Sequence, residues 1–162
     1  TTTDFSAWPA FLPIVLIFSS FIGGCAGSTG GGLKVIRILL LFLQGKREVD
    51  RLIHPKAVYA VKLGDRAMPE RVVEAVWGFF SAYAVVFVVI MIALIATGMD
   101  DITAFSATAA TLNNLGPGLG GVAGTYADVT NAGKWLLVIA MLFGRLEIFS
   151  LLVLFSPTFW RS

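Results

Sequence analysis

The sequence predicts an all-α membrane protein in which one helix is broken by a glycine-rich loop and one short loop re-enters the membrane. Of its 162 residues, 57% are hydrophobic and 14% are charged, and the mean hydropathy is +0.84. Soluble domains carry about 25% charged residues, so this composition indicates a membrane protein. A run of 25 uncharged residues at 75–99 and two glycine-containing breaks, at 23–32 and 113–118, predict the rest of the architecture.

The composition also excludes several classes of protein. A single cysteine, Cys25, cannot close an intrachain disulfide, and the apolar fraction is too high for a disordered segment. A net charge of +2 speaks against a nucleic-acid partner. The sequence starts with Thr1 and carries no signal-peptide pattern, so we expect a piece of a longer chain.

Basic residues indicate which side of the membrane the loops occupy. Nine of the twelve Lys and Arg residues lie between positions 34 and 71, against four acidic residues. Short membrane loops that are rich in Lys and Arg stay on the cytoplasmic side. We therefore expect residues 46–70 to form a basic cytoplasmic connector, with the C-terminus on the same side.

Residues 1–45 are expected to hold one inward-running helix that is broken in its middle. Residues 8–22 are apolar but short for a crossing, which takes about 20 residues. The apolar pattern resumes at residues 33–43. Two unrelated helices joined by a cytoplasmic linker are the alternative, although such a linker usually carries more charge and Pro. The loop expected at membrane depth consists of Gly23, Gly24, Cys25, Ala26, Gly27, Ser28, Thr29, Gly30, Gly31 and Gly32.

Residues 72–98 predict a helix that crosses the membrane outward. The 25 uncharged residues at 75–99 cover about 37 Å as a helix, more than the hydrocarbon core of about 30 Å. Trp77 is placed for the inner interface, and Gly98 suits the end of the helix. Residues 133–156 predict the helix that returns inward.

Residues 101–118 are too short and too often broken to be a further crossing. A helix over residues 101–112, with Asp101 as its N-cap, covers only about 17 Å along its uncharged part. The following Asn-Asn-Leu-Gly-Pro-Gly disfavours helix and strand alike. Irregular backbone at membrane depth occurs only where it is buried in protein or lines water. We therefore expect a re-entrant pore loop whose carbonyls replace the hydration shell of a monovalent cation, with Gly116 allowing the necessary dihedral angles. An external loop lying on the membrane surface is the alternative.

Arg145 is the charge that most needs an explanation. It lies near the middle of the span expected over residues 133–156, where a charge costs roughly 2.5 to 3.5 kcal/mol on insertion scales. Glu147 is two residues away and points in a different direction on a helix, so it is a poor partner. We expect Arg145 to face pore water or the irregular backbone of residues 23–32. A structural ion pair with an acid on a helix outside this sequence is the alternative.

No arrangement of residues in the sequence supports catalysis or an organic cofactor. Residues 116–121 match the pattern G-x-G-x-x-G, but no preceding strand or following amphipathic helix accompanies them. Residues 27–34 lack the Lys-Ser/Thr order of a phosphate-binding loop. His54, the single histidine, is expected to be a solvated loop residue of the basic connector. We therefore predict that the protein is not an enzyme.

Three motifs resemble those of one family. They are IGGCAGSTGGGLKVIR at residues 22–37, ATLNNLGPG at 110–118 and MLFGRLE at 141–147. In this order they resemble the C-terminal third of the TrkH-type bacterial potassium-uptake channel subunit, in the Trk/Ktr/HKT superfamily. The resemblance implies a four-repeat pore, each repeat consisting of a helix, a pore loop and a second helix. Residues 1–45 then correspond to the second helix of the third repeat, and residues 71–162 to the fourth repeat.

The resemblance also implies roles for the residues singled out above. The loop of residues 23–32 corresponds to the intramembrane gating loop, and Arg145 to an arginine that faces the pathway from the last helix. Residues 113–118 correspond to the fourth filter strand, with Asn113, Asn114, Leu115 and Gly116 as its ion-binding positions. Potassium would be held by the backbone carbonyls of Asn114, Leu115 and Gly116. Pro117 and the two Asn residues depart from the potassium-channel filter sequence, so strong selectivity does not follow.

As a family member, the protein is expected to carry potassium, K+, inward across the bacterial inner membrane. The resemblance implies four partners: the N-terminal repeats of the same parent chain, a gating cytosolic nucleotide-binding ring of the TrkA type, a second copy in a homodimer, and membrane lipid. The alternative is a helical membrane anchor or interaction module with no transport role. A membrane anchor does not require the short helix and Gly-Pro-Gly break of residues 101–118. The presence of this segment therefore favours the transport function.

Overall fold

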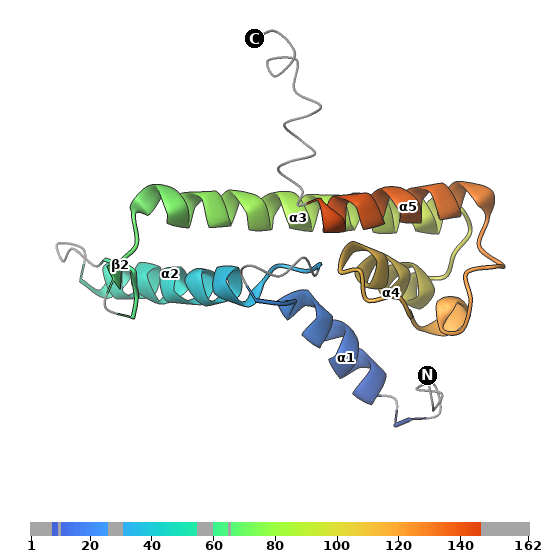
Figure 1. Ribbon diagram of the computed structural model, residues 1–162, viewed down its shortest axis with the longest axis horizontal. Coiled ribbons are helices and arrows are strands. Elements are labelled where there is room, and N and C mark those ends of the chain that lie inside the picture. The colour runs from blue at the N-terminus through green and yellow to red at the C-terminus, as the bar shows by residue number, and fades with distance from the viewer. Residues whose placement is uncertain (1–7, 10, 26–30, 55–59, 65, 147–162) are drawn as a thin grey trace, which may run out of the picture.

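The computed structural model describes residues 8, 9, 11–25, 31–54, 60–64 and 66–146. This part of the chain holds five α-helices, one short 3-10 helix and a two-stranded antiparallel hairpin (Figure 1). In chain order the elements are α1 (Phe11–Ile22), α2 (Val35–Ile53), β1 (Lys62–Leu63), β2 (Arg66–Ala67), α3 (Glu70–Ala96), α4 (Asp101–Leu112), η2 (Gly120–Val122) and α5 (Asn131–Arg145).

Helix α3 organises the other elements. Helix α2 lies along its N-terminal half, α4 and α5 lie along its C-terminal half, and α1 slants away from the junction of α2 and α4 (Figure 1). Three clusters of buried side chains follow α3 from one end to the other. They are Val73 and Val76 with Leu40 and Val61, Phe79 and Tyr83 with Leu33 and Leu112, and Ile90 and Leu94 with Ala104, Ala107, Val122, Leu137 and Ala140.

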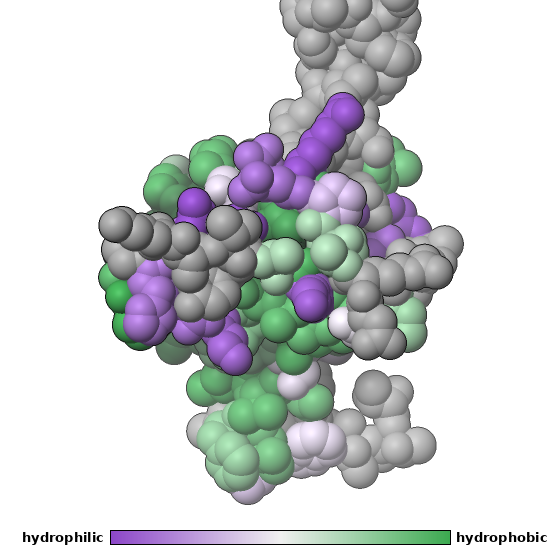
Figure 2. Space-filling model, turned by 90° about the vertical axis from the view of Figure 1, so that its left-hand side faces the viewer, coloured by the Kyte–Doolittle hydropathy of each residue, from purple (hydrophilic) through white to green (hydrophobic). Residues whose placement is uncertain are grey.

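Large apolar side chains cover much of the outer surface of the helices. Phe42 is 81% exposed, and Phe11 and Trp135 are also exposed. Seen from the end of the molecule that carries the hairpin, α1 projects as a mostly hydrophobic lobe, and hydrophilic side chains gather around the basic end of α2 (Figure 2). Helices whose apolar residues face outward on this scale are typical of contact with lipid or with further helices rather than with water.

Helix α3 is long enough to cross a bilayer. Within the described residues it is the one helix of sufficient length and apolar composition, and its 27 residues cover about 40 Å. It starts two residues before the expected 72–98, because Pro69 favours the start of a helix and Glu70 places a negative charge in the first turn. It ends at Ala96, and Gly98 follows with φ +93°.

The broken helix expected near the N-terminus is confirmed. Helix α1 ends at Ile22 and α2 begins at Val35. The backbone amide of Leu33 donates to the Phe21 carbonyl at 3.0 Å, and that of Val35 donates to the Gly24 carbonyl at 3.2 Å. These bonds join the two half-helices at the base of the glycine loop.

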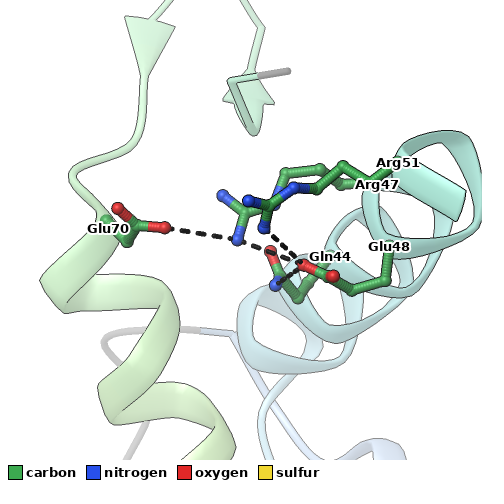
Figure 3. A network of polar contacts seen from close by, with 5 residues as sticks. All are labelled: Gln44, Arg47, Glu48, Arg51 and Glu70. Carbon is green, nitrogen blue, oxygen red and sulfur yellow. Dashed lines mark hydrogen bonds and ion pairs between the residues drawn. The ribbon is translucent and has the colours of Figure 1, made fainter. Parts of the chain in front are cut away.

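Helix α2 continues farther than the sequence suggested. The expected connector of residues 46–70 begins inside a helix that ends at Ile53, so the non-helical part is shorter. Side chains at helical spacing explain the extension, since Gln44 Nε2 donates to Glu48 Oε1 at 2.8 Å and Arg51 Nη1 lies 3.5 Å from the same oxygen. Figure 3 shows this network and its link to α3, in which Arg47 reaches Glu70 at 3.6 Å. Its residues are Gln44, Arg47, Glu48, Arg51 and Glu70.

Helix α4 occupies the residues expected for the short helix, 101–112, but its cap differs. The N-cap is Asp100, whose Oδ2 accepts a hydrogen bond from the Thr103 amide at 3.0 Å, and Asp101 is the first helical residue. Both aspartates fit the rule for N-caps, and Asp100 is the one with the extended backbone of an N-cap, at φ −68° and ψ 156°. Small residues such as Ala104 and Ala107 are fully buried and let α4 approach α3 and α5 closely.

Helix α5 is shorter than the expected 133–156 in the described part of the chain. It begins at Asn131, where Thr130 caps it by accepting from the Gly133 amide at 3.2 Å. It ends at Arg145, and Leu146 lies in a bend. Residues 147–156 of the expected helix lie outside the described residues, so its inner half stays a prediction. A cation in the last turn complements the free carbonyls of a helix end, which is a physical reason for the helix to stop there.

Candidate functional site

The chain changes direction sharply where α4 ends. Asn113 is the C-cap, Asn114 has φ +54° and Gly116 has φ +107°. The amides of Leu115 and Gly116 both donate to the Ala110 carbonyl, at 2.8 and 3.4 Å. The irregular backbone expected from residue 113 onward is thus present. Positive φ values explain the residue types, because Gly and Asn tolerate this region best.

This turn lies level with the middle of α3. Tyr83 is the central residue of the 27 that form α3, and its hydroxyl donates to Asn113 Oδ1 at 2.5 Å. Helix α4 therefore ends about halfway along the spanning helix, as a re-entrant helix must.

The Asn113 side chain points away from the exposed face of the turn. Its Nδ2 donates to Ser20 Oγ at 2.8 Å, and Asn113 is only 5% exposed. The Ser20 hydroxyl itself donates to the Ile17 carbonyl at 2.6 Å. The side chain that we expected among the ion-binding positions is therefore used to join α4 to α1 and α3. Sequence alone gave no sign of Ser20 or Tyr83, because both lie far from residue 113 in the chain.

The next backbone carbonyls remain open. Within the described ranges no hydrogen bond reaches the carbonyl oxygens of Asn114 and Leu115. The Gly116 carbonyl accepts a hydrogen bond from the Tyr126 hydroxyl at 2.8 Å. Burial raises the pKa of Tyr126, which keeps this hydroxyl protonated as a donor. Leu115 is 43% exposed, so this part of the turn faces outward from the described chain.

Two glycines hold the end of α4 between them. A Cβ on Gly144 would overlap the Leu112 carbonyl oxygen and lie 2.7 Å from Asn114 Nδ2. A Cβ on Gly31 would overlap the Asn113 carbonyl oxygen and lie 3.0 Å from the same nitrogen. Asn114 Nδ2 is buried there and has no hydrogen-bond partner among the described residues. Gly144, which the sequence left as an ordinary helix residue, is thus part of the site.

The glycine loop is described at its two ends. Gly23 and Gly32 have φ +67° and +84°, and a Cβ on Gly32 would lie 2.8 Å from the Ser20 carbonyl oxygen. Gly24 and Cys25 follow on the first arm, and Gly31 on the second. The predicted gating residues Ala26, Gly27, Ser28, Thr29 and Gly30 lie outside the described residues. The loop therefore reaches the end of α4 through Gly31.

Arg145 lies at the depth of the turn. It directly follows Gly144, which packs against the Leu112 carbonyl, and its side chain is exposed. A second arginine at the central level is Arg37, whose guanidinium carbon lies 4.1 Å from the centroid of the Phe79 ring. Glu147, the acid considered with Arg145, lies outside the described residues. The described chain thus places Gly144, the residue before Arg145, against Leu112 and Asn114.

A helical membrane protein with a re-entrant helix, whose irregular backbone begins halfway along a spanning helix, is the class that this fold and site define. The sequence profile described as "TrkH: Cation transport protein" matches residues 1–162. The chain therefore belongs to the TrkH family of cation transport proteins.

Relatives of known name agree with this assignment. The Trk system potassium uptake protein TrkH of Vibrio parahaemolyticus is 71% identical over 162 residues, which is all of this chain and 33% of that protein. TrkG of Escherichia coli K12 is 42% identical over 161 residues, 99% of this chain and 33% of its own length. The crystal structure of the potassium transporter TrkH from Vibrio parahaemolyticus superposes with a TM-score of 0.91 at 71% identity, covering 99% of this chain and 34% of that one.

These similarities show the fold class and family of the chain, and the share of its relatives' length that it spans. The predicted fold class is confirmed by the solved relative, and the chain is part of a membrane protein. Its relatives are named as transport proteins. The chain spans about a third of the length of the relatives it matches.

Proposed function

We propose that this chain supplies one wall of a potassium-uptake pathway across the bacterial inner membrane. The observation that carries the proposal is the turn after α4, at the level of the middle of α3, where the carbonyls of Asn114 and Leu115 accept no hydrogen bond from the described part of the chain. Rows of such carbonyls replace the hydration shell of a monovalent cation. The names of the relatives, all potassium uptake proteins, favour K+ as that cation.

The ion-binding positions of the filter strand, residues 113–116, play two different parts. Asn113 contributes a buried side chain that anchors the strand, whereas Asn114, Leu115 and Gly116 offer backbone carbonyls to K+. The Gly116 carbonyl is shared with Tyr126, which fixes its direction through one lone pair and leaves the other for the ion. The remaining walls come from the N-terminal repeats of the parent chain.

Residues 23–32 form the gate of this pathway, and Arg145 helps to keep it closed. Contact of Gly31 with the root of the strand supports a loop that lies directly against the filter. A guanidinium carries five donors, and Arg145 lies at the depth where the irregular backbone offers acceptors. Seven of the ten loop residues are Gly or Ala, which permits rearrangement.

A cytosolic nucleotide-binding ring of the TrkA type acts on the gate from the basic side. Residues 46–70 and the C-terminus face the cytoplasm, as the excess of Lys and Arg predicts. Helix α2 connects the glycine loop to this side by 19 continuous helical residues, so a force applied at its end reaches the loop. The parent protein works as a homodimer in lipid.

The test is potassium flux by the full-length parent protein in lipid vesicles. Gly116→Ala introduces a side chain where there is open space but φ is +107°, so it strains the backbone by about 1–2 kcal/mol without a steric clash. Gly124→Ala is the matched control, because Gly124 also has open space and lacks a positive φ.

We expect Gly116→Ala to lower potassium flux and Gly124→Ala to leave it unchanged. Wild-type vesicles without potassium flux would refute the transport function and favour the alternative of a membrane anchor. Equal flux in all three proteins would show that residue 116 is not part of the filter.

A further inference from the structure

Asn113 connects three separate parts of the chain at one buried point. Its side-chain oxygen accepts from Tyr83 of α3, and its side-chain nitrogen donates to Ser20 of α1. Its backbone forms the C-cap of α4. The oxygen and the nitrogen of the Asn113 side-chain amide are therefore both hydrogen-bonded. These two bonds fix the side-chain rotamer and determine the orientation of the amide.

The helix before the glycine loop and the second arm of the loop both contact this residue. Ser20, in α1 three residues before Gly23, accepts from the Asn113 side chain, while Gly31, on the second arm, packs against the Asn113 carbonyl. A change in the position of the second arm relative to α1 therefore changes the surroundings of Asn113.

The residue that follows is held in an uncommon conformation. Asn114 has φ +54°, a region that non-glycine residues seldom adopt, and its carbonyl accepts no hydrogen bond from the described residues. Anchoring of the preceding residue opposes relaxation of this backbone. Loss of one anchor should therefore let the Asn114 carbonyl turn.

We infer that Asn113 is a positioning residue for ion selection, and that Ser20 and Tyr83 act through it by fixing the directions of the carbonyls of Asn114 and Leu115. The inference rests on the proposed function. Its observable consequence is a change in the ratio of sodium to potassium flux, a quantity that mere loss of folded protein does not alter.

The experiment uses the full-length parent protein in vesicles of phosphatidylethanolamine and phosphatidylglycerol, with K+ and Na+ influx measured separately. The variants are Ser20→Ala and Tyr83→Phe, each of which removes one hydroxyl. Ser20→Thr is the conservative variant that retains the hydroxyl. Ser19→Ala is the matched control, because the Ser19 hydroxyl bonds only the Val15 carbonyl of its own helix in the described chain.

We expect Ser20→Ala and Tyr83→Phe to raise the ratio of Na+ to K+ influx by about two- to tenfold, the range that corresponds to one hydrogen bond. Ser20→Thr and Ser19→Ala should keep the wild-type ratio. An unchanged ratio in both hydroxyl-deletion variants, with normal wild-type potassium flux, overturns the inference alone. Absence of potassium flux in the wild type overturns the proposed function instead.

Discussion

Replacing Gly144 by alanine should separate α5 from the end of α4. The added Cβ would overlap the Leu112 carbonyl oxygen and approach Asn114 Nδ2 to 2.7 Å. The first of these is a backbone atom, so no change of rotamer relieves the overlap, and the helices must move apart. Overpacking of this kind costs about 1–3 kcal/mol.

Gly45→Ala is the control, and it is expected to raise the stability of the protein rather than lower it. Gly45 also lies inside a helix, α2, and a Cβ there would meet no atom within 4 Å. Alanine at an open helix position stabilises by about 0.5–1 kcal/mol. Both substitutions gain this helix propensity, so it cancels in the comparison, and the difference of about 1–3 kcal/mol between them isolates the contact with α4.

The assay is thermal unfolding of the purified full-length parent protein in detergent, together with potassium flux in vesicles. Gly144→Ala should lower the Tm and reduce flux, because α5 packs against the turn that carries the open carbonyls. Gly45→Ala should match or exceed the wild-type Tm. A Tm of Gly144→Ala equal to that of the wild type would refute the steric reasoning.

Three further results are expected. Arg145→Ala, or deletion of residues 27–31, should raise basal potassium flux and weaken its dependence on the cytosolic ring; folded, inserted variants that leak no more than the wild type would make Arg145 a structural residue. Tyr126→Phe should lower potassium flux while leaving the Tm nearly unchanged, and a wild-type flux would show that the bond to the Gly116 carbonyl is dispensable. Hydrogen bonds from the first turn of α4 lower the pKa of Asp100 below its usual value. These hydrogen bonds therefore stabilise the fold above the usual pKa of an aspartate, and their contribution is lost as the pH falls through the lowered pKa of Asp100. Asp100→Ala should reduce the Tm at pH 7 but not under strongly acid conditions. A series of melting curves at different pH values will check this.

Local patterns were sufficient to predict the elements that depend on local chemistry. The uncharged run gives α3, and the Asn-Asn-Leu-Gly string ends α4 at Leu112, where the structure ends it. The glycine segment separates α1 from α2 as expected. The end of α2 was missed because the interactions of Gln44, Glu48 and Arg51 extend a helix that the polar composition alone had suggested to be a loop.

The candidate site was predictable in its backbone but not in its side chains. Glycine, proline and asparagine indicate where irregular backbone falls, since their dihedral preferences are intrinsic. The partners of that backbone are set by tertiary packing. In the sequence, nothing distinguishes Tyr83 from the other residues of the apolar helix α3, and Tyr126 lies in a loop without a periodic pattern. Gly144 is inconspicuous for the same reason, because only the close approach of α4 requires a glycine there.

The hydrogen bond between Asn113 and Ser20 joins residues 93 positions apart, and this separation imposes an order on synthesis. At a translation rate of about 5–20 residues per second, Asn113 is synthesised roughly 5–20 s after Ser20. The acceptor of the Ser20 hydroxyl, the Ile17 carbonyl, lies in the same helical turn, so this bond does not depend on Asn113, and α1 has the partner for that donor within itself. When Asn113 arrives, its amide uses a free lone pair of that hydroxyl oxygen, and the contact forms without breaking an existing bond.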